Sequence, residues 1–221
     1  MVDQNVSLKH MNTFGIDATA KLFTVIRNQK DLEKVLEQET EEPIFILGGG
    51  SNILFTENYK GLILKNEIKG FEVIDETDDF AIVESGAGEN WHQFVLKCID
   101  NNLGGIENLS LIPGNCGTAP VQNIGAYGVE LQDVFVSCEG ILIADGSPFK
   151  LSKEDVRFGY RNSIFKNEWK GKTALLNQRV CRLQDFNEID SKFLFYGINK
   201  YLKDIINVYN KCIYNDYSLY N

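Results

Sequence analysis

The chain has 221 residues, which is enough for one large domain or two small ones with a buried core. Hydrophobic residues make up 43% of it and charged residues 24%, a composition typical of a soluble globular protein rather than a disordered one. The formal net charge of -9 argues against nucleic acid as a partner, because nucleic-acid binding usually needs a clustered basic surface.

The first predicted unit is a compact β-α-β-loop-β arrangement. Residues 22–26 are a short apolar, β-branched run, and Asn28 is the expected N-cap of a helix over 29–38, where apolar residues recur at helical spacing. The next strand runs directly into three glycines. Beyond the first strand, further extended segments are predicted at 44–47, 53–55 and 61–64.

A second unit begins near residue 70. Its first two strands, 71–74 and 80–84, are predicted to form a hairpin across an acidic turn. A helix over 91–101 follows, and we expect a glycine within 103–106 to supply the left-handed residue that often ends a helix. Further short strands are predicted at 134–136, 140–144 and 149–151.

The composition changes after Lys172. Of the 19 glycines only Gly197 lies beyond it, whereas most of the nine tyrosines do, and a helix is predicted over 198–208. We therefore divide the chain into two subdomains and an atypical C-terminal tail, with the ranges 1–68, 69–172 and 173–221.

Cysteine usage and hydropathy indicate the compartment. The cysteines are odd in number and widely spaced, which favours reduced thiols in a cytoplasmic protein over a disulfide frame or a metal site. Residues 1–10 lack the apolar core of a signal peptide, and no apolar run approaches the roughly 20 residues of a membrane helix. We expect a cytoplasmic protein with no membrane partner and no metal. The five cysteines are Cys98, Cys116, Cys138, Cys181 and Cys212.

The first motif that carries chemistry follows the strand at 44–47. Three glycines let backbone N–H groups approach an anion closely, and Ser51 and Asn52 add side-chain donors. The segment is neither a Walker loop nor a G-x-G-x-x-G fingerprint. It predicts a diphosphate cradle, with a tight turn between strands as the alternative.

The second motif is the segment Ser110–Gly128, which is dense in Gly, Pro and Asn. Loops of this length are more often functional than decorative, although a purely structural omega loop is the alternative. The third motif is Arg157–Lys166, where two arginines, a lysine and a tyrosine indicate an anion-facing patch or a solvated strand.

In this order and spacing the motifs resemble the UDP-N-acetylenolpyruvoylglucosamine reductase (MurB) family. The resemblance covers roughly residues 8 to 172. It implies an α+β chain with the two-subdomain FAD-binding fold of the vanillyl-alcohol-oxidase/PCMH type, here without the family's third, substrate-binding domain. The matching segments are Asn12-Thr13-Phe14-Gly15, G-G-G-S-N at 48–52, S-L-I-P-G-N-C-G-T-A-P-V-Q-N-I-G-A-Y-G at 110–128 and Y-R-N-S-I-F-K at 160–166.

The resemblance implies FAD as cofactor and NADPH as hydride donor, for the reduction of UDP-N-acetylenolpyruvoylglucosamine to UDP-N-acetylmuramate in peptidoglycan synthesis. Family members are usually monomeric. Arg161 matches the catalytic arginine, whose charge would stabilise the enolate-like intermediate, and Tyr160 and Arg161 would contact the substrate. The cofactor contacts carried over are Gly48, Gly49, Gly50, Ser51, Asn52, Pro113, Gly114, Gly117, Gln122, Asn123, Gly125 and Tyr127.

The tail departs from the family pattern. Residues 173–221 contain no G-S-F-F-K-N-P motif with the proton-donating serine and no late glutamate, and 173–179 does not resemble the strand that begins the substrate domain. A frameshift or early stop in the coding sequence is our expectation. Three functions stay open: an active reductase, an FAD-binding fragment without turnover, and a different flavin oxidase of the same fold.

Overall fold

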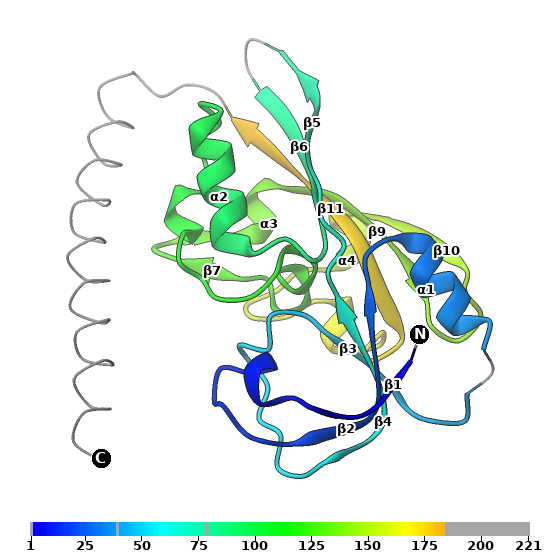
Figure 1. The fold of residues 1–221 in the computed structure, drawn as a ribbon. Helices are drawn as coiled ribbons and strands as arrows, with labels where there is room; N and C mark the ends of the chain where they lie inside the picture. Colours follow the sequence, from blue (N-terminus) through cyan, green and yellow to red (C-terminus); the bar gives the residue numbers. More distant parts are fainter. Residues whose placement is uncertain (1, 39, 78–79, 184–221) are drawn as a thin grey trace, which may run out of the picture. The chain divides into compact units, whose positions relative to one another are not determined.

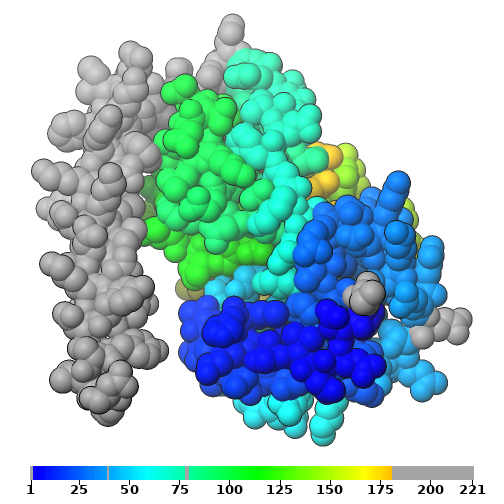
Figure 2. All heavy atoms as spheres, viewed as in Figure 1, coloured from blue at the N-terminus to red at the C-terminus, as the bar shows by residue number. Residues whose placement is uncertain are grey.

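The computed structural model describes residues 2–38, 40–77 and 80–183 (Figure 1). They form two sheets, with the strands of the first drawn from residues 3–66 and those of the second from 71–183, apart from one two-stranded ribbon. In the space-filling view the N-terminal residues, in blue, lie directly against residues of the middle of the chain, in cyan and green (Figure 2). No helix in these described ranges is long and apolar enough to cross a membrane.

The first sheet has the strand order β1-β2-β4-β3. Strand β4 pairs in parallel with both β2 and β3, whereas β1 is antiparallel to β2. The side chain of Asn28 accepts a hydrogen bond of 2.9 Å from the amide of Asp31 and so caps the connecting helix α1, as predicted. The elements are β1 (Asp3–Ser7), β2 (Thr19–Ile26), α1 (Gln29–Leu36), β3 (Ile44–Leu47) and β4 (Tyr59–Asn66).

The second sheet is antiparallel, with the order β10-β9-β11-β6-β5. Helix α2 contributes Trp91, Phe94 and Val95 to the largest core, in which they join Ala81 and Val83 of β6. The predicted hairpin and helix of this unit are thereby confirmed. Its elements are β5 (Phe71–Glu76), β6 (Phe80–Gly86), α2 (Trp91–Asp100), α3 (Leu131–Val134), β9 (Phe135–Leu142), β10 (Pro148–Ser152), α4 (Lys153–Val156) and β11 (Thr173–Leu183).

Strand β11 corrects the predicted beginning of the tail. Residues from Thr173 onward pair with both β6 and β9, so the strand lies in the middle of the second sheet. Ala174, Leu175 and Val180 are buried there. The structural division of the chain falls after Leu183 and not after Lys172. The change in composition after Lys172 therefore does not mark the end of the fold.

Other predicted boundaries also move. Residues 53–55 form no strand, and the segments predicted at 134–136 and 140–144 both overlap the single strand β9, which ends at Leu142. The left-handed residue that directly follows α2 is Asn102, with φ 59°, and the predicted glycine comes later, as Gly105 with φ 104°. Strand β1 was not predicted, because its sequence is polar and exposed. The helix predicted over 198–208 lies outside the described residues.

Candidate functional site

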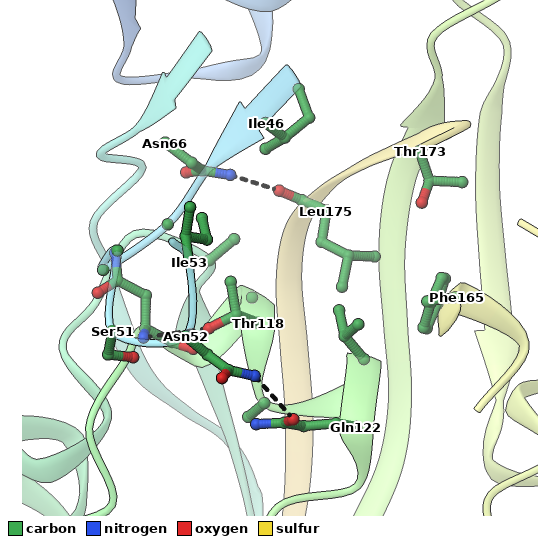
Figure 3. A pocket seen from close by; sticks show the side chains of 18 of the residues that line it. Ile46, Ser51, Asn52, Ile53, Asn66, Thr118, Gln122, Phe165, Thr173 and Leu175 are labelled. Atoms are coloured by element: carbon green, nitrogen blue, oxygen red, sulfur yellow. Dashed lines mark hydrogen bonds between the residues drawn. The ribbon is translucent and has the colours of Figure 1, made fainter. Parts of the chain in front are cut away.

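A cavity of about 310 Å³ lies where loops of the first sheet meet loops of the second (Figure 3). Its volume is within the range of small-molecule sites, about 300–1,000 Å³. Strand β3 and the residues after it form one wall, and the segment Pro113–Ile124 forms another. Phe165 and Thr173 line the side across from Ser51 and Asn52.

The residues Gly48–Asn52, here called the glycine turn, directly follow β3. Gly50 has φ +70°, and a Cβ added to it would lie 1.9 Å from the carbonyl oxygen of Met11. A Cβ on Gly48 would lie 2.5 Å from Cγ2 of Thr118. Close packing therefore accounts for glycine at both positions, whether or not a ligand is bound.

The backbone amides of the glycine turn are a separate observation. Those of Gly50, Ser51 and Asn52 donate no hydrogen bond to another residue in the described part of the chain. All three residues line the cavity. Because successive N–H groups that are not used inside the protein can form a concave anion site, the turn fits a phosphate or diphosphate.

The second wall comes from the short helical turns of the segment Ser110–Gly128. Thr118 holds one of them, since its hydroxyl donates to the carbonyl of Asn115 at 2.8 Å and accepts from the amide of Asn115 at 3.2 Å. Gly117 rests against β6 and the residue after it, where a Cβ would lie 2.5 Å from the Cβ of Ala87. This wall is therefore fixed to the core of the second subdomain.

Two hydrogen bonds at the cavity join residues of the first subdomain to residues of the second (Figure 3). The side-chain amide of Asn52 donates to Oε1 of Gln122 at 3.2 Å, and that of Asn66 donates to the carbonyl of Leu175 at 2.8 Å. The ammonium group of Lys65 donates to the carbonyl oxygen of Gly48, and burial lowers the pKa of this lysine. The first two sequence motifs are thus brought to one site by contacts between the sheets.

Most of the predicted cofactor residues line the cavity, but not all of them do. Its lining includes Gly48, Gly49, Gly50, Ser51, Asn52, Pro113, Gly117 and Gln122. Gly114 lies beside it, with its Cα 3.0 Å from a Cβ built on Gly49. The other predicted residues outside the lining are Asn123, Gly125, Tyr127, Tyr160 and Arg161.

Sequence reasoning missed the apolar end of the cavity. Ile44 and Ile46 were interpreted as part of a strand, Phe165 as part of the third motif, and Trp169 was not considered. The ring of Trp169 stands edge-on to that of Phe149, with centroids 5.1 Å apart. Only the apolar character of these residues was visible in the sequence, and that character does not separate a cavity wall from a core.

The site offers an anion-binding turn beside an apolar slot, and within the described lining Lys170 is the one residue that carries a formal charge. This donor set suits a ligand that joins a diphosphate to flat aromatic groups. Cys116 lies between two lining residues of the cavity. Burial raises the pKa of its thiol to about 12, so the thiol stays protonated near neutral pH and is not a nucleophile there. A flavin dinucleotide has the chemistry that these residues fit.

Comparison with known proteins agrees with this reading of the fold. A family model described as FAD binding domain matches residues 7–152, and the chain belongs to that family. It is also 53% identical, over 169 residues, to the UDP-N-acetylenolpyruvoylglucosamine reductase of Flavobacterium johnsoniae, covering 76% of this chain and 50% of the relative. The resemblance seen in the motifs is therefore confirmed, although the chain spans about half the length of the curated relatives it matches.

Solved structures confirm the expected fold. UDP-N-acetylenolpyruvylglucosamine reductase from Thermus caldophilus superimposes with a TM-score of 0.68 at 23% identity, covering 84% of this chain and 64% of that one. Cholesterol oxidase from Brevibacterium sterolicum superimposes with a TM-score of 0.61 at 13% identity, covering 84% and 38%. At these identities the likeness concerns the α+β FAD-binding fold alone.

Proposed function

We propose that this chain binds FAD in the cavity between its two sheets. The free amides of Gly50, Ser51 and Asn52 would donate to the diphosphate, and the apolar end of the cavity would hold a flat ring. The observation that carries the proposal is the position of these three amides on a cavity that the segment Pro113–Ile124 also lines. The match of residues 7–152 to an FAD binding domain supports it.

We further propose that the chain takes part in the reduction of UDP-N-acetylenolpyruvoylglucosamine by NADPH, giving UDP-N-acetylmuramate for peptidoglycan synthesis. When bound, FAD would supply hydride transfer between the two. The relatives' names support this reaction, and it stays a proposal because the chain spans about half their length.

Arg161 would bind a carboxylate of the substrate and stabilise negative charge that develops beside it, and Tyr160 would contact the same molecule. Both residues lie at an exposed turn, where they are accessible to a small molecule. Pro113, Gly117 and Gln122 are proposed as flavin contacts because they line the cavity, and Gly114 because it lies beside it. Gly125 and Tyr127 are proposed on the strength of the motif alone.

The test begins with the visible absorbance spectrum of the purified chain and a titration with FAD. Gly49→Ala is the informative variant, because its Cβ would lie 3.0 Å from Gly114 and Asn115 and would narrow the cradle. We expect its FAD dissociation constant to rise about tenfold, or about 1.4 kcal/mol. The matched control is Gly70→Ala, whose Cβ meets its nearest atom at 3.7 Å and lies outside the cavity lining. A chain that takes up no FAD contradicts the proposal.

A second candidate is an FAD-binding module without turnover, and the match of residues 7–152 to an FAD binding domain fits it equally. Anaerobic addition of NADPH, followed by the enolpyruvyl substrate, distinguishes the reductase from the module without turnover. Bleaching of bound flavin followed by reoxidation on adding substrate supports the reductase. Bleaching that the substrate leaves unchanged supports the module.

A further inference from the structure

Two surface turns hold the exposed tyrosines of the second and third motifs. The tyrosine turn, Ala126–Val129, joins the strands β7 (Gly125–Ala126) and β8 (Val129–Glu130), and it has Tyr127 at its tip with φ 53°. The arginine turn, Gly159–Asn162, is closed by two reciprocal backbone hydrogen bonds of 3.0 Å and has Tyr160 and Arg161 at its tip. Tyr127 and Tyr160 are each 88% exposed.

Asn123 lies between the bases of these turns and is completely buried. Its side-chain nitrogen donates to Oε2 of Glu130 at 3.0 Å and to the carbonyl of Gly159 at 3.1 Å. Its side-chain oxygen accepts from the amide of Gln132 at 3.0 Å. Glu130 ends the tyrosine turn's second strand and Gly159 begins the arginine turn, so one side chain touches both.

The hydrogen-bonding capacity of Asn123 is therefore largely used inside the protein. A side-chain amide has two donor hydrogens, and both have acceptors here. A direct bond from this nitrogen to a cofactor would require one of them to break and would leave a buried acceptor without a partner. The expected contact of Asn123 with the cofactor stays a prediction, and the side-chain amide is already used inside the protein.

We propose that Asn123 is a positioning residue that holds the tyrosine turn and the arginine turn in one fixed arrangement. Arg161 and Tyr127 are thereby presented together, without contact between Asn123 and the ligand. Ser163 adds a second connection on the other side of the arginine turn, because its buried hydroxyl donates to the carbonyl of Val121 at 2.7 Å. A role of this arrangement in catalysis rests on the proposed function, whereas the fixed arrangement of the two turns does not.

The test measures the distance between the turns without cofactor or substrate. Spin labels are attached through Tyr127→Cys and Tyr160→Cys, with Cys181 and Cys212 replaced by Ser, and read by double electron–electron resonance. The cysteines at 98, 116 and 138 are buried, and burial raises the pKa of each thiol to about 12, which keeps them unlabelled. A single narrow distance is expected in the parent.

Asn123→Gly is the informative variant, since glycine accepts the left-handed φ of 43° and only the side chain is lost. We expect loss of the single narrow distance. The matched control is Asn12→Gly, because Asn12 is also buried and also makes three hydrogen bonds with its side chain, to Leu8 and Ile16. The control should keep the narrow distance.

A narrow distance in Asn123→Gly overturns the proposal, and so does equal broadening in Asn12→Gly, which would indicate general loosening. Weaker FAD binding in Asn123→Gly without broadening assigns the residue to the cofactor instead. If Asn123→Gly does not fold, hydrogen exchange of the Asn123 side-chain amide in the parent decides. Slow exchange is expected, and exchange at the rate of an exposed amide overturns the proposal. None of these results depends on whether the chain turns over substrate.

Discussion

Gln178 is a fully buried polar residue in the middle of β11 whose side chain is poorly satisfied. Neither its nitrogen nor its oxygen has a hydrogen-bond partner among the described residues, and its polar neighbour is the thiol of Cys116, a weak partner. An unsatisfied buried amide costs about 1–3 kcal/mol. We expect Gln178→Met, which has a similar volume, to raise the free energy of unfolding by about 1 kcal/mol in urea denaturation.

The same change at Gln132 provides the control for Gln178. The side-chain nitrogen of Gln132 donates to Oε2 of Glu130 at 2.6 Å, so Gln132→Met should be neutral or destabilising. A Gln178→Met chain that unfolds at lower urea concentration than the parent would mean that Gln178 has a strong partner in solution.

Glu139 of β9 makes stability depend on acid pH. Burial raises the pKa of its carboxyl, but hydrogen bonds from Arg179, Asn177 and Lys150 and the charge of Arg179 lower it to about 2. A group whose folded pKa lies below its ordinary value stabilises the fold above that ordinary value, here 4.5, and the stabilisation is lost as the pH falls toward 2. The carboxyl is partly exposed, so we expect screening to limit the effect to on the order of 1 kcal/mol.

The pH prediction is measured by urea unfolding at several values between about pH 5 and pH 2.5. Glu139→Gln should be less stable than the parent at the upper end, and the difference should shrink as the pH falls. Asp155, an exposed carboxylate in the capping box of α4, serves as the comparison through Asp155→Asn. A Glu139→Gln chain whose deficit is constant over this range would exclude the carboxylate as the source.

At the scale of elements, β11 holds the second sheet together. Without it the strands on its two sides, β10-β9 and β6-β5, become separate hairpins, which are marginally stable alone. We expect a chain ending at residue 172 to lose cooperative thermal unfolding measured by circular dichroism, and a chain ending at residue 183 to retain it. Cooperative unfolding of the shorter chain would mean that the second core forms without β11.

The elements also show what the sequence could predict. Strand β3, the cap of α1 and the hairpin β5-β6 carry local signals, namely an apolar run, an Asn at the N-cap and paired strands around an acidic turn, and all three were predicted. Strand β11 was not, because Asn177, Gln178 and Arg179 interrupt its apolar pattern. Arg179 is accommodated by ion pairs to Glu84 and Glu139 on neighbouring strands, which only the folded sheet brings together.

The candidate site likewise has a part that the sequence predicted and a part that it did not. The glycine turn and the segment at 110–128 were predicted as one cofactor site from their motifs, and the structure places most of their residues on one cavity. The apolar end could not be predicted, since Ile44 and Trp169 lie outside the motifs, and the third motif gave no sign that Phe165 would line the cavity. The role of Asn123 could not be predicted either, because its partners lie at Glu130, Gln132 and Gly159.

At the scale of the whole molecule, an anionic ligand meets a protein with a formal net charge of -9. Long-range electrostatics therefore oppose binding of a diphosphate, and the described cavity lining has Lys170 as its one charged residue. The proposed attraction comes from backbone N–H dipoles at contact distance, which salt screens little. Salt should thus weaken the repulsion more than the attraction.

The salt prediction follows from this difference in range. Between about 0.01 M and 0.1 M salt the Debye length falls from about 30 Å to about 10 Å, so repulsion from distant carboxylates fades while contacts inside the cavity persist. We expect the FAD dissociation constant, measured by flavin fluorescence titration, to stay constant or fall by about twofold over this range. Lys170→Gln should leave the direction of the trend unchanged. A dissociation constant that rises steeply with salt in the parent but not in Lys170→Gln would mean that the lysine, rather than the glycine turn, provides the main attraction for the diphosphate.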